Sequence, residues 1–120
     1  FLNGTGVTVN QGMFVYVDAT PEVQLANAAA VASSGGVGFL TANTAAGGSS
    51  TLRVGGLSPY FLEAGDPGAS TGDMLFLSSA EAGKLTTVAP AAGVGVVIVQ
   101  AGTHLDGEVL INIRVTMEYT

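Results

Sequence analysis

The chain alternates apolar and polar positions over short stretches that are separated by glycine-rich turns. The central example lies in residues 71–90, where an apolar run at 74–77 and an alternating run at 84–88 flank a small polar connection that ends at Gly83. Two short runs joined by a glycine-containing loop predict a β-hairpin, because Gly83 can take the positive φ angle that the return requires. We expect this hairpin to be the element around which the rest of the chain is organised.

Further alternating stretches predict strands in the N-terminal half. They cover residues 7–9, 13–18, 22–25, 37–42 and 51–54, and the last two form a second hairpin around a glycine-rich loop. In 13–18, Met13, Val15 and Val17 share one face while Phe14 and Tyr16 share the other, and the aromatic side chains favour a strand. Residues 26–32 are mostly alanine without the 3.6-residue spacing of large apolar side chains, so we expect irregular or extended chain there.

The C-terminal third predicts an interior strand, a turn and a last strand. Residues 94–100 are apolar on both faces, as in a strand that is covered on both sides. Residues 102–107 contain two glycines and carry His104, and we expect a turn there. Beyond the turn, five apolar side chains are expected to face the core: Val109, Ile111, Ile113, Val115 and Met117.

The strand and turn signals together define the fold class. Eight to ten short strands with almost no helix predict an all-β protein, a small antiparallel β-sandwich or β-barrel. Eighteen glycines suit the corners that such folds must turn. The length of 120 residues fits one hydrophobic core, so residues 1–120 are expected to form a single β domain.

Composition adds an expectation about partners. Charged residues make up 10% of the chain, against about 25% in ordinary soluble domains, while apolar residues reach 48%. A domain of this size cannot hide so much apolar surface in one core, so we expect a homo-oligomer. No apolar run approaches the ~20 residues that a membrane-spanning helix needs, and we expect no membrane partner.

The net charge and the residue types present argue against several further functions. The net charge of −6, with only three basic residues, is the opposite of what phosphate-binding surfaces need, so we expect no nucleic-acid partner. The chain has no cysteine, hence no disulfide and no thiolate metal site. His104 is the only histidine and no nucleophile-elbow motif is present, so we expect neither an enzyme nor a cofactor, with no catalytic or metal-ligating residues. Two possibilities stay open. Two distant carboxylates could meet in the fold as the catalytic pair of a glycoside hydrolase, and acidic residues of the loops could bind calcium.

Aromatic residues and the histidine are the candidate interface residues of the predicted oligomer. We select seven positions: Phe14, Tyr16, Tyr60, Phe61, Phe76, His104 and Tyr119. Large aromatic side chains are enriched among the residues that contribute most to binding in protein interfaces. Four of them, Tyr16, Tyr60, Phe61 and Tyr119, would alternatively suit a platform on which sugar rings stack.

An ordered series of short motifs resembles a family of bacteriophage virion β-domains, namely small capsid decoration (cement) proteins and the β-domains of tail fibres. The motifs run through most of the chain: residues 9–12 leading into 14–17, then 37–39, 52–57, 72–78 and 83–86. The most distinctive are a glycine-aspartate pair before an apolar-aromatic-apolar strand at 72–77 and the glycine-x-leucine-threonine at 83–86.

This resemblance implies a role and a location but no catalytic residues. It implies a capsid decoration protein on the head surface, bound as an oligomer, commonly a trimer, to the major capsid protein. The alternative within the family is a tail-fibre or baseplate domain for virion assembly or host-surface glycan binding. Outside it, a carbohydrate-binding module and a filament subunit remain, the latter marked by an unpaired terminal strand at 109–117 that completes a neighbour's sheet.

Overall fold

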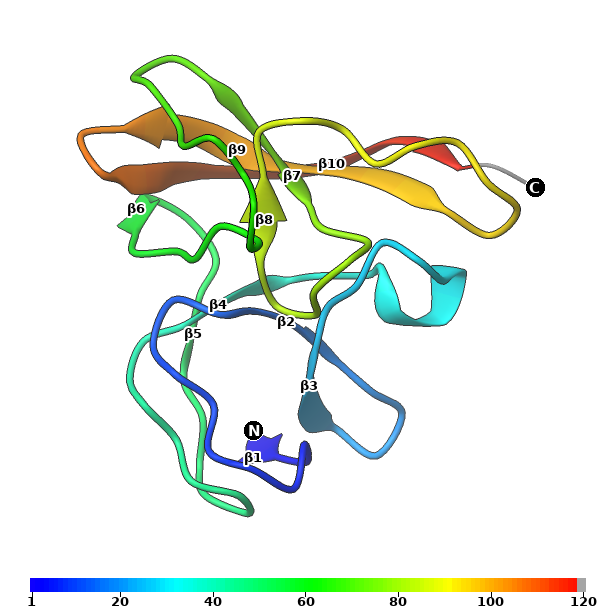
Figure 1. The fold of residues 1–120 in the computed structure, drawn as a ribbon. Coiled ribbons are helices and arrows are strands. Elements are labelled where there is room, and N and C mark those ends of the chain that lie inside the picture. The colour runs from blue at the N-terminus through cyan, green and yellow to red at the C-terminus, as the bar shows by residue number, and fades with distance from the viewer. Residues whose placement is uncertain (119–120) are drawn as a thin grey trace.

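A computed structural model describes residues 1–118, which form ten strands in two five-stranded sheets that pack together (Figure 1). The N-terminal sheet has the order β1-β3-β2-β4-β5, and the C-terminal sheet has the order β6-β10-β9-β7-β8. The predicted all-β architecture with eight to ten short strands is therefore confirmed.

The N-terminal sheet contains four of the five strands predicted in the first half of the chain and one strand, β1, that was not predicted. Its members are β1 (Leu2–Asn3), β2 (Phe14–Val17), β3 (Glu22–Leu25), β4 (Gly38–Leu40) and β5 (Leu52–Arg53). β1 pairs with β3 in parallel, and the other neighbours pair antiparallel. Residues 7–9 form no strand but a single bridge between Val9 and Thr44. Residues 26–30 are irregular, as expected, and one turn of 3-10 helix follows at Val31–Ser33.

The N-terminal sheet curls into a half-barrel because its first strand returns to the segment before β5. Leu2 bridges Ser49, and the backbone N–H of Asn3 donates to the carbonyl of Gly48 at 2.8 Å. The enclosed side holds a small core of four buried apolar residues: Val9, Val15, Val23 and Leu40.

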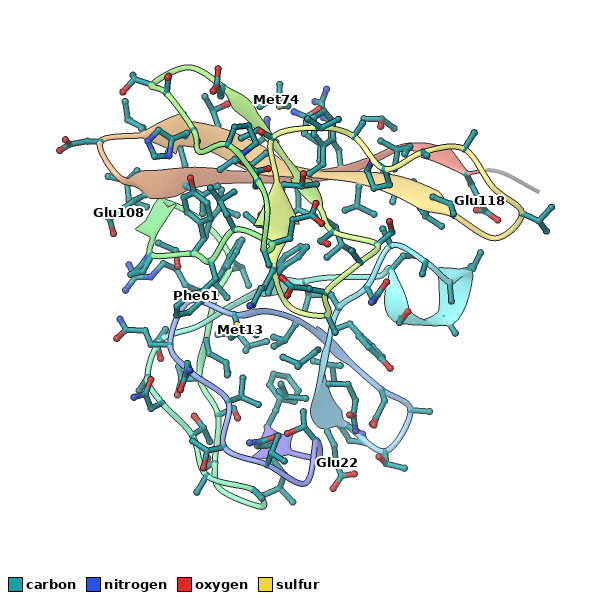
Figure 2. The ribbon with its side chains drawn as sticks, in the orientation of Figure 1. Met13, Glu22, Phe61, Met74, Glu108 and Glu118 are labelled. Atoms are coloured by element: carbon teal, nitrogen blue, oxygen red, sulfur yellow. The ribbon has the colours of Figure 1, made fainter. Side chains whose placement is uncertain are left out.

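The predicted hairpin at residues 74–88 forms, but it lies at one edge of the C-terminal sheet, so it is not the element around which the chain is organised. The strands of this sheet are β6 (Leu57–Ser58), β7 (Met74–Leu77), β8 (Leu85–Thr86), β9 (Val97–Leu105) and β10 (Glu108–Glu118), and Figure 2 labels the two ends of β10. β7 and β8 pair antiparallel, and Gly83 returns the chain with a φ of 80°. β9 lies between β7 and β10, which confirms an interior strand, but the strand begins at Val97 and not at Val94, which is 90% exposed in the preceding loop.

The turn expected at 102–107 is wrong, because β9 continues through His104 to Leu105 and only Asp106 and Gly107 form the turn. Gly102 lies within the strand for a packing reason. A Cβ atom at this position would lie 2.1 Å from the carbonyl oxygen of Leu110 on β10, so the two backbones approach too closely for any other residue.

The expected inward face of the last strand holds only in its first half. Val109 is buried and Ile111 and Ile113 pack against the main core, but the side chain of Val115 is 61% exposed. The register of β10 against β9 shifts between Ile111 and Arg114 and again between Val115 and Met117. Each shift inserts an extra residue and reverses which side chains face inward. The side chain of Met117 lies outside the described part of the structure.

The main core fills the space between the two sheets. Phe14 and Phe39 are paired across β2 and β4, are fully buried, and stack with ring centroids 4.7 Å apart. Opposite them lie seven buried side chains of the C-terminal sheet: Leu75, Leu77, Leu85, Val97, Val99, Ala101 and Val109. This contact is dominated by large apolar side chains and is the main source of stability.

Candidate functional site

The curl of the N-terminal sheet leaves an apolar groove of about 570 Å³. Its wall combines the ends of β2 and β5 with the residues just before β4 and β5. Five lining residues are apolar, namely Phe1, Val17, Val37, Leu52 and Val54, and two are small and polar, namely Ser50 and Thr51. A concave apolar surface of this volume is the usual form of a binding site, and no lining residue is titratable through its side chain.

Ser50 gives the groove an unsatisfied polar group. The residue is only 5% exposed, and its Oγ atom has no hydrogen-bond partner among the described residues. Its backbone N–H, by contrast, donates to the carbonyl of Phe1. A buried hydroxyl without a partner costs about 1–3 kcal/mol, and because this oxygen is sealed from the surface, the cost is borne by the fold itself.

A second, smaller hollow of about 260 Å³ lies beside Asp66, whose carboxylate ties two loops together. The backbone N–H groups of Thr87 and Gly68 donate to it at 2.8 and 2.9 Å, and the hydroxyl of Thr86 donates at 3.1 Å. Burial alone would raise the pKa of Asp66, but these hydrogen bonds outweigh it and lower the pKa below the ordinary value. The carboxylate is therefore occupied in holding loops, as expected of a structural residue.

The lowered pKa of Asp66 predicts acid sensitivity. Because this pKa is lower in the folded than in the unfolded chain, its stabilising contribution is full above the ordinary value of 3.8 and is lost as pH falls through the folded pKa. Urea unfolding at pH 6, 4 and 3 is expected to show a smaller loss of stability for D66N than for the wild type. A residual loss is expected from Asp18, whose pKa is lowered to about 2, chiefly by the Thr20 hydroxyl. Equal losses in both proteins would contradict this role of Asp66.

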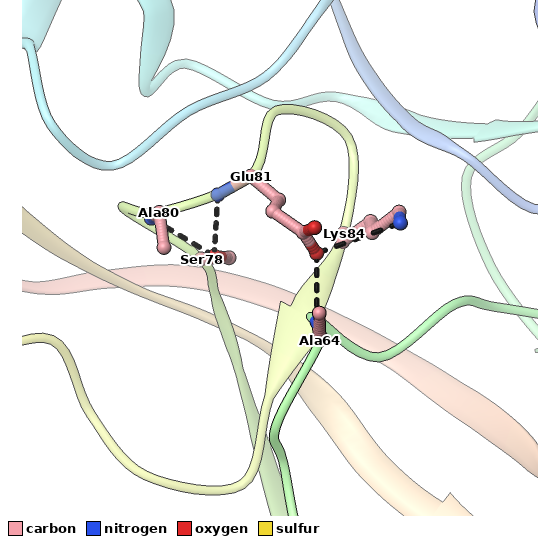
Figure 3. A network of polar contacts seen from close by, with 5 residues as sticks. All are labelled: Ala64, Ser78, Ala80, Glu81 and Lys84. Atoms are coloured by element: carbon pink, nitrogen blue, oxygen red, sulfur yellow. Dashed lines mark hydrogen bonds and ion pairs between the residues drawn. The ribbon is translucent and has the colours of Figure 1, made fainter.

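Glu81 also serves the architecture of the β7–β8 hairpin (Figure 3). Its Oε2 atom accepts from the backbone N–H of Ala64 at 2.8 Å and lies 3.5 Å from Nζ of Lys84. In the same loop, Oγ of Ser78 accepts from the backbone N–H groups of Ala80 and Glu81 at 3.1 and 3.0 Å. These contacts hold the loop between β7 and β8 against the backbone at Ala64. The exposed ion pair itself adds little energy.

Tyr60 and His104 are brought together from the chain after β6 and from β9. The Tyr60 hydroxyl lies 2.7 Å from Nδ1 of His104, and the two rings meet edge to face. Burial, reinforced by the negative charges of Asp66 and Asp73, raises the pKa of Tyr60. The phenol therefore stays protonated at neutral pH, which makes the pair a structural contact rather than an activated nucleophile.

The other candidate interface residues are dispersed. Phe14 is fully buried in the main core, and Tyr16 packs against that core while half-buried. Phe76 is half-buried on the opposite face of β7 from Leu75 and Leu77, and Phe61 is 40% exposed. Tyr119 lies outside the described residues. Within residues 1–118, these aromatics form no single platform.

Exposed apolar side chains are instead spread over both sheets and their loops. Fourteen large ones are exposed: Phe1, Leu2, Val7, Val31, Val37, Val54, Leu57, Phe61, Met74, Val88, Val94, Leu105, Leu110 and Val115. Exposed apolar residues that are scattered singly are normal on a protein surface, so these positions need no separate explanation.

Other kinds of site do not assemble in the described part of the chain. There, no group of three or more histidine, cysteine, aspartate or glutamate residues lies close enough to hold a metal ion. Within residues 1–118, no helix has the length and apolar character needed to cross a membrane. The groove was missed by sequence reasoning because its residues come from four separate segments, none of which carries a local signal.

Comparisons of the chain with protein-family models, with curated proteins and with solved structures found no match. The candidate site therefore stands on its geometry.

Proposed function

We propose that this chain is a non-enzymatic structural protein of a bacteriophage particle, a capsid decoration protein that binds the head shell as an oligomer and stabilises it. The observation that carries the proposal is the composition of the chain, in which 48% of the residues are apolar and only twelve are charged. Such a composition favours permanent contact with a shell and with sister subunits over life as a free monomer. The motif resemblance at residues 72–78 and 83–86 supports the class.

Several polar side chains form hydrogen bonds that stabilise the fold itself, which supports a structural role. Asp66 and Glu81 hold loops, and Tyr60 and His104 satisfy one another. These hydrogen bonds and the glycines in the turns make a small protein rigid without disulfides. Such rigidity suits a subunit that must keep its shape on a particle.

The alternative of a filament subunit has no support from β10. That strand pairs with β9 along both of its halves and with β6 at Val109 and Leu110, so it is not the free terminal strand that donation to a neighbour requires. A tail-fibre or baseplate domain remains the alternative, since it would use the same apolar surface in another part of the particle.

The proposal is tested on phage particles whose genome encodes this chain. Immunogold labelling with an antiserum against residues 1–120 is expected to mark the head surface. Heads stripped of the protein are expected to release DNA at a lower temperature, and adding back the purified chain should restore the original value. Label on the tail would replace the head assignment by the tail alternative. Unchanged thermal stability of stripped heads would remove the stabilising role.

A further inference from the structure

We propose that the peptide bond between Asp66 and Pro67 is a self-cleavage site, which the folded chain protects by binding the side-chain carboxylate of Asp66. The sequence contains this aspartate–proline pair once. The bond is cut when acid acts on a chain in which the contacts of Asp66 have opened. This chemistry belongs to the chain itself and does not depend on a role in a phage particle.

Both sides of the bond favour cleavage in acid. The side chain of an aspartate can bring a carboxylate oxygen onto the carbonyl carbon of its own residue and close a five-membered ring. Such an intramolecular attack has a high effective concentration. The nitrogen of proline belongs to a tertiary amide and leaves as a secondary amine, which takes up a proton readily. No other peptide bond of the chain combines the two features.

The cleavage balances with water as the only co-reactant. A carboxylate oxygen of Asp66 forms a bond to the carbonyl carbon of Asp66, and the carbon–nitrogen bond to Pro67 breaks. The nitrogen of Pro67 takes a proton from the acidic solvent, and residue 66 is left as a cyclic anhydride. Water then opens the anhydride and restores the side-chain carboxyl group beside a new C-terminal one. The products are residues 1–66 and 67–120.

The fold occupies the attacking group. Oδ2 of Asp66 accepts from the backbone N–H of Thr87 at 2.8 Å and from the hydroxyl of Thr86 at 3.1 Å. Oδ1 accepts from the backbone N–H of Gly68 at 2.9 Å. The hydroxyl of Thr87 lies 3.1 Å from Oδ1 and 3.0 Å from Oδ2. Because a carboxylate has about four lone-pair sites, these contacts engage both oxygens and hold them away from the attack.

The fold also holds the two sides of the bond together. Before the bond, the backbone N–H of Ala64 donates to Oε2 of Glu81 at 2.8 Å, and the backbone N–H of Asp66 donates to the carbonyl of Glu63 at 3.2 Å. After the bond, Gly68 is bound to Asp66 itself. An amine that leaves under these restraints stays beside the anhydride and reforms the peptide bond. Net cleavage therefore needs the loop to open.

Acid has two opposite effects at this site. Attack needs the ionised carboxylate, whereas departure of the nitrogen needs a proton. In the open chain the carboxyl group returns to its ordinary pKa of 3.8, so a substantial share is still ionised at pH 3.5. Two further titratable side chains share this environment: Tyr60, whose pKa is raised in part by the charge of Asp66, and Glu63, which lines the same hollow.

The cut does not by itself separate the two parts of a folded chain. Residues 1–66 carry the N-terminal sheet and β6, whereas residues 67–120 carry β7 to β10. β6 pairs with β10, and Phe14 and Phe39 share the main core with side chains of the C-terminal sheet. The two fragments therefore stay together in the folded state, and the cut has to be detected under denaturing conditions.

The test measures cut chain by denaturing mass spectrometry at pH 3.5 over a series of urea concentrations, while circular dichroism reports the folded fraction. The fragments are expected to end at Asp66 and to begin at Pro67. Their rate of formation should rise with the unfolded fraction, and the folded chain should be cut at least about tenfold more slowly than the unfolded one. The bonds after Asp18 and Asp73, which lack proline, are internal controls and are expected to stay intact.

Three variants separate the chemistry of the bond from its protection. P67A keeps the aspartate but removes the proline nitrogen, so it is expected to abolish cleavage even in the unfolded chain. T86V/T87V removes two hydroxyl donors to Asp66 at nearly constant shape, and it is expected to be cut several-fold faster than the wild type at equal folded fraction. The matched control T41V removes a hydroxyl that donates to the carbonyl of Thr51, and it is expected to be cut like the wild type.

Three results would overturn the inference. The first is an unfolded wild type that stays intact between Asp66 and Pro67, and the second is a folded wild type that is cut as fast as the unfolded chain. The third is equal cleavage of T86V/T87V and the wild type at equal folded fraction, since the contacts of Asp66 would then not protect the bond.

Discussion

Replacing Phe14 by alanine is expected to lower the free energy of unfolding by about 3–5 kcal/mol. The ring is fully buried, stacks on Phe39, and belongs to the core between the two sheets, so its removal leaves a cavity at their junction. Since domains of this size are stable by only about 5–15 kcal/mol, the variant should be folded but fragile. Urea unfolding followed by circular dichroism is expected to show a midpoint about 2 M lower.

Phe61 provides the matched control for this prediction. It is the same residue type, but 40% of its side chain is exposed and it lies outside the core clusters. F61A is expected to lose less than about 1 kcal/mol, as substitutions near the surface usually do. Similar losses for F14A and F61A would contradict the assignment of Phe14 to the main core.

Replacing Gly102 by alanine is expected to destabilise the C-terminal sheet by about 3 kcal/mol. The added methyl carbon would lie 2.1 Å from the carbonyl oxygen of Leu110 and 2.9 Å from its carbonyl carbon. Both atoms belong to the backbone, so the clash cannot be relieved by turning a side chain. β9 and β10 must separate around this point. Hydrogen exchange is expected to show faster exchange at amides of both strands, together with a lower unfolding temperature.

Gly55 separates this steric effect from the general effect of adding a methyl group. No atom lies within 4 Å of a Cβ built at Gly55, and its φ is not positive. G55A is therefore expected to change stability by no more than about 0.5 kcal/mol. If G102A were as stable as G55A, the close approach of β9 to β10 would be wrong.

Local patterns predicted the strands and hairpins, because pairing between neighbours in sequence leaves a local signature. The alternation in residues 13–18 placed Phe14 and Tyr16 opposite Val15, and the structure confirms it: Phe14 and Tyr16 meet the main core, whereas Val15 lies in the half-barrel core. Gly83 and the runs on either side of it predicted the β7–β8 hairpin for the same reason.

Sequence patterns do not reveal whether a given face of a strand is covered by the core, by another strand or by solvent. Phe14 was selected as an interface residue because alternation distinguishes two faces without telling core from surface. Gly102 was taken for part of a turn because the close approach of Leu110 depends on a partner strand that sequence spacing does not reveal. Val115 was placed inward because two bulges in β10 reverse the alternation without a distinctive residue to mark them.

The groove illustrates a stronger limit on prediction from sequence. Val17, Val37 and Val54 are far apart in the chain and come together because the N-terminal sheet curls until Leu2 reaches Ser49. Curvature is a property of the whole sheet, so no window of sequence contains it. Val94 shows a related limit, since its place in an apolar run predicted an interior strand, whereas the structure leaves it exposed in the loop before β9.

The position of β6 sets an order for folding during synthesis. The chain leaves the N-terminal sheet at β5 and immediately forms β6, whose only partner is β10, about fifty residues later. The half-barrel contains residues 2–53 and can close while the ribosome is still making the remainder. β6, by contrast, waits with an unpaired edge until residues 109 and 110 emerge. A pause in translation after β6 and before residue 109 would leave an unpaired sheet edge open for longer. During such a pause, nascent chains could pair wrongly with one another through that edge.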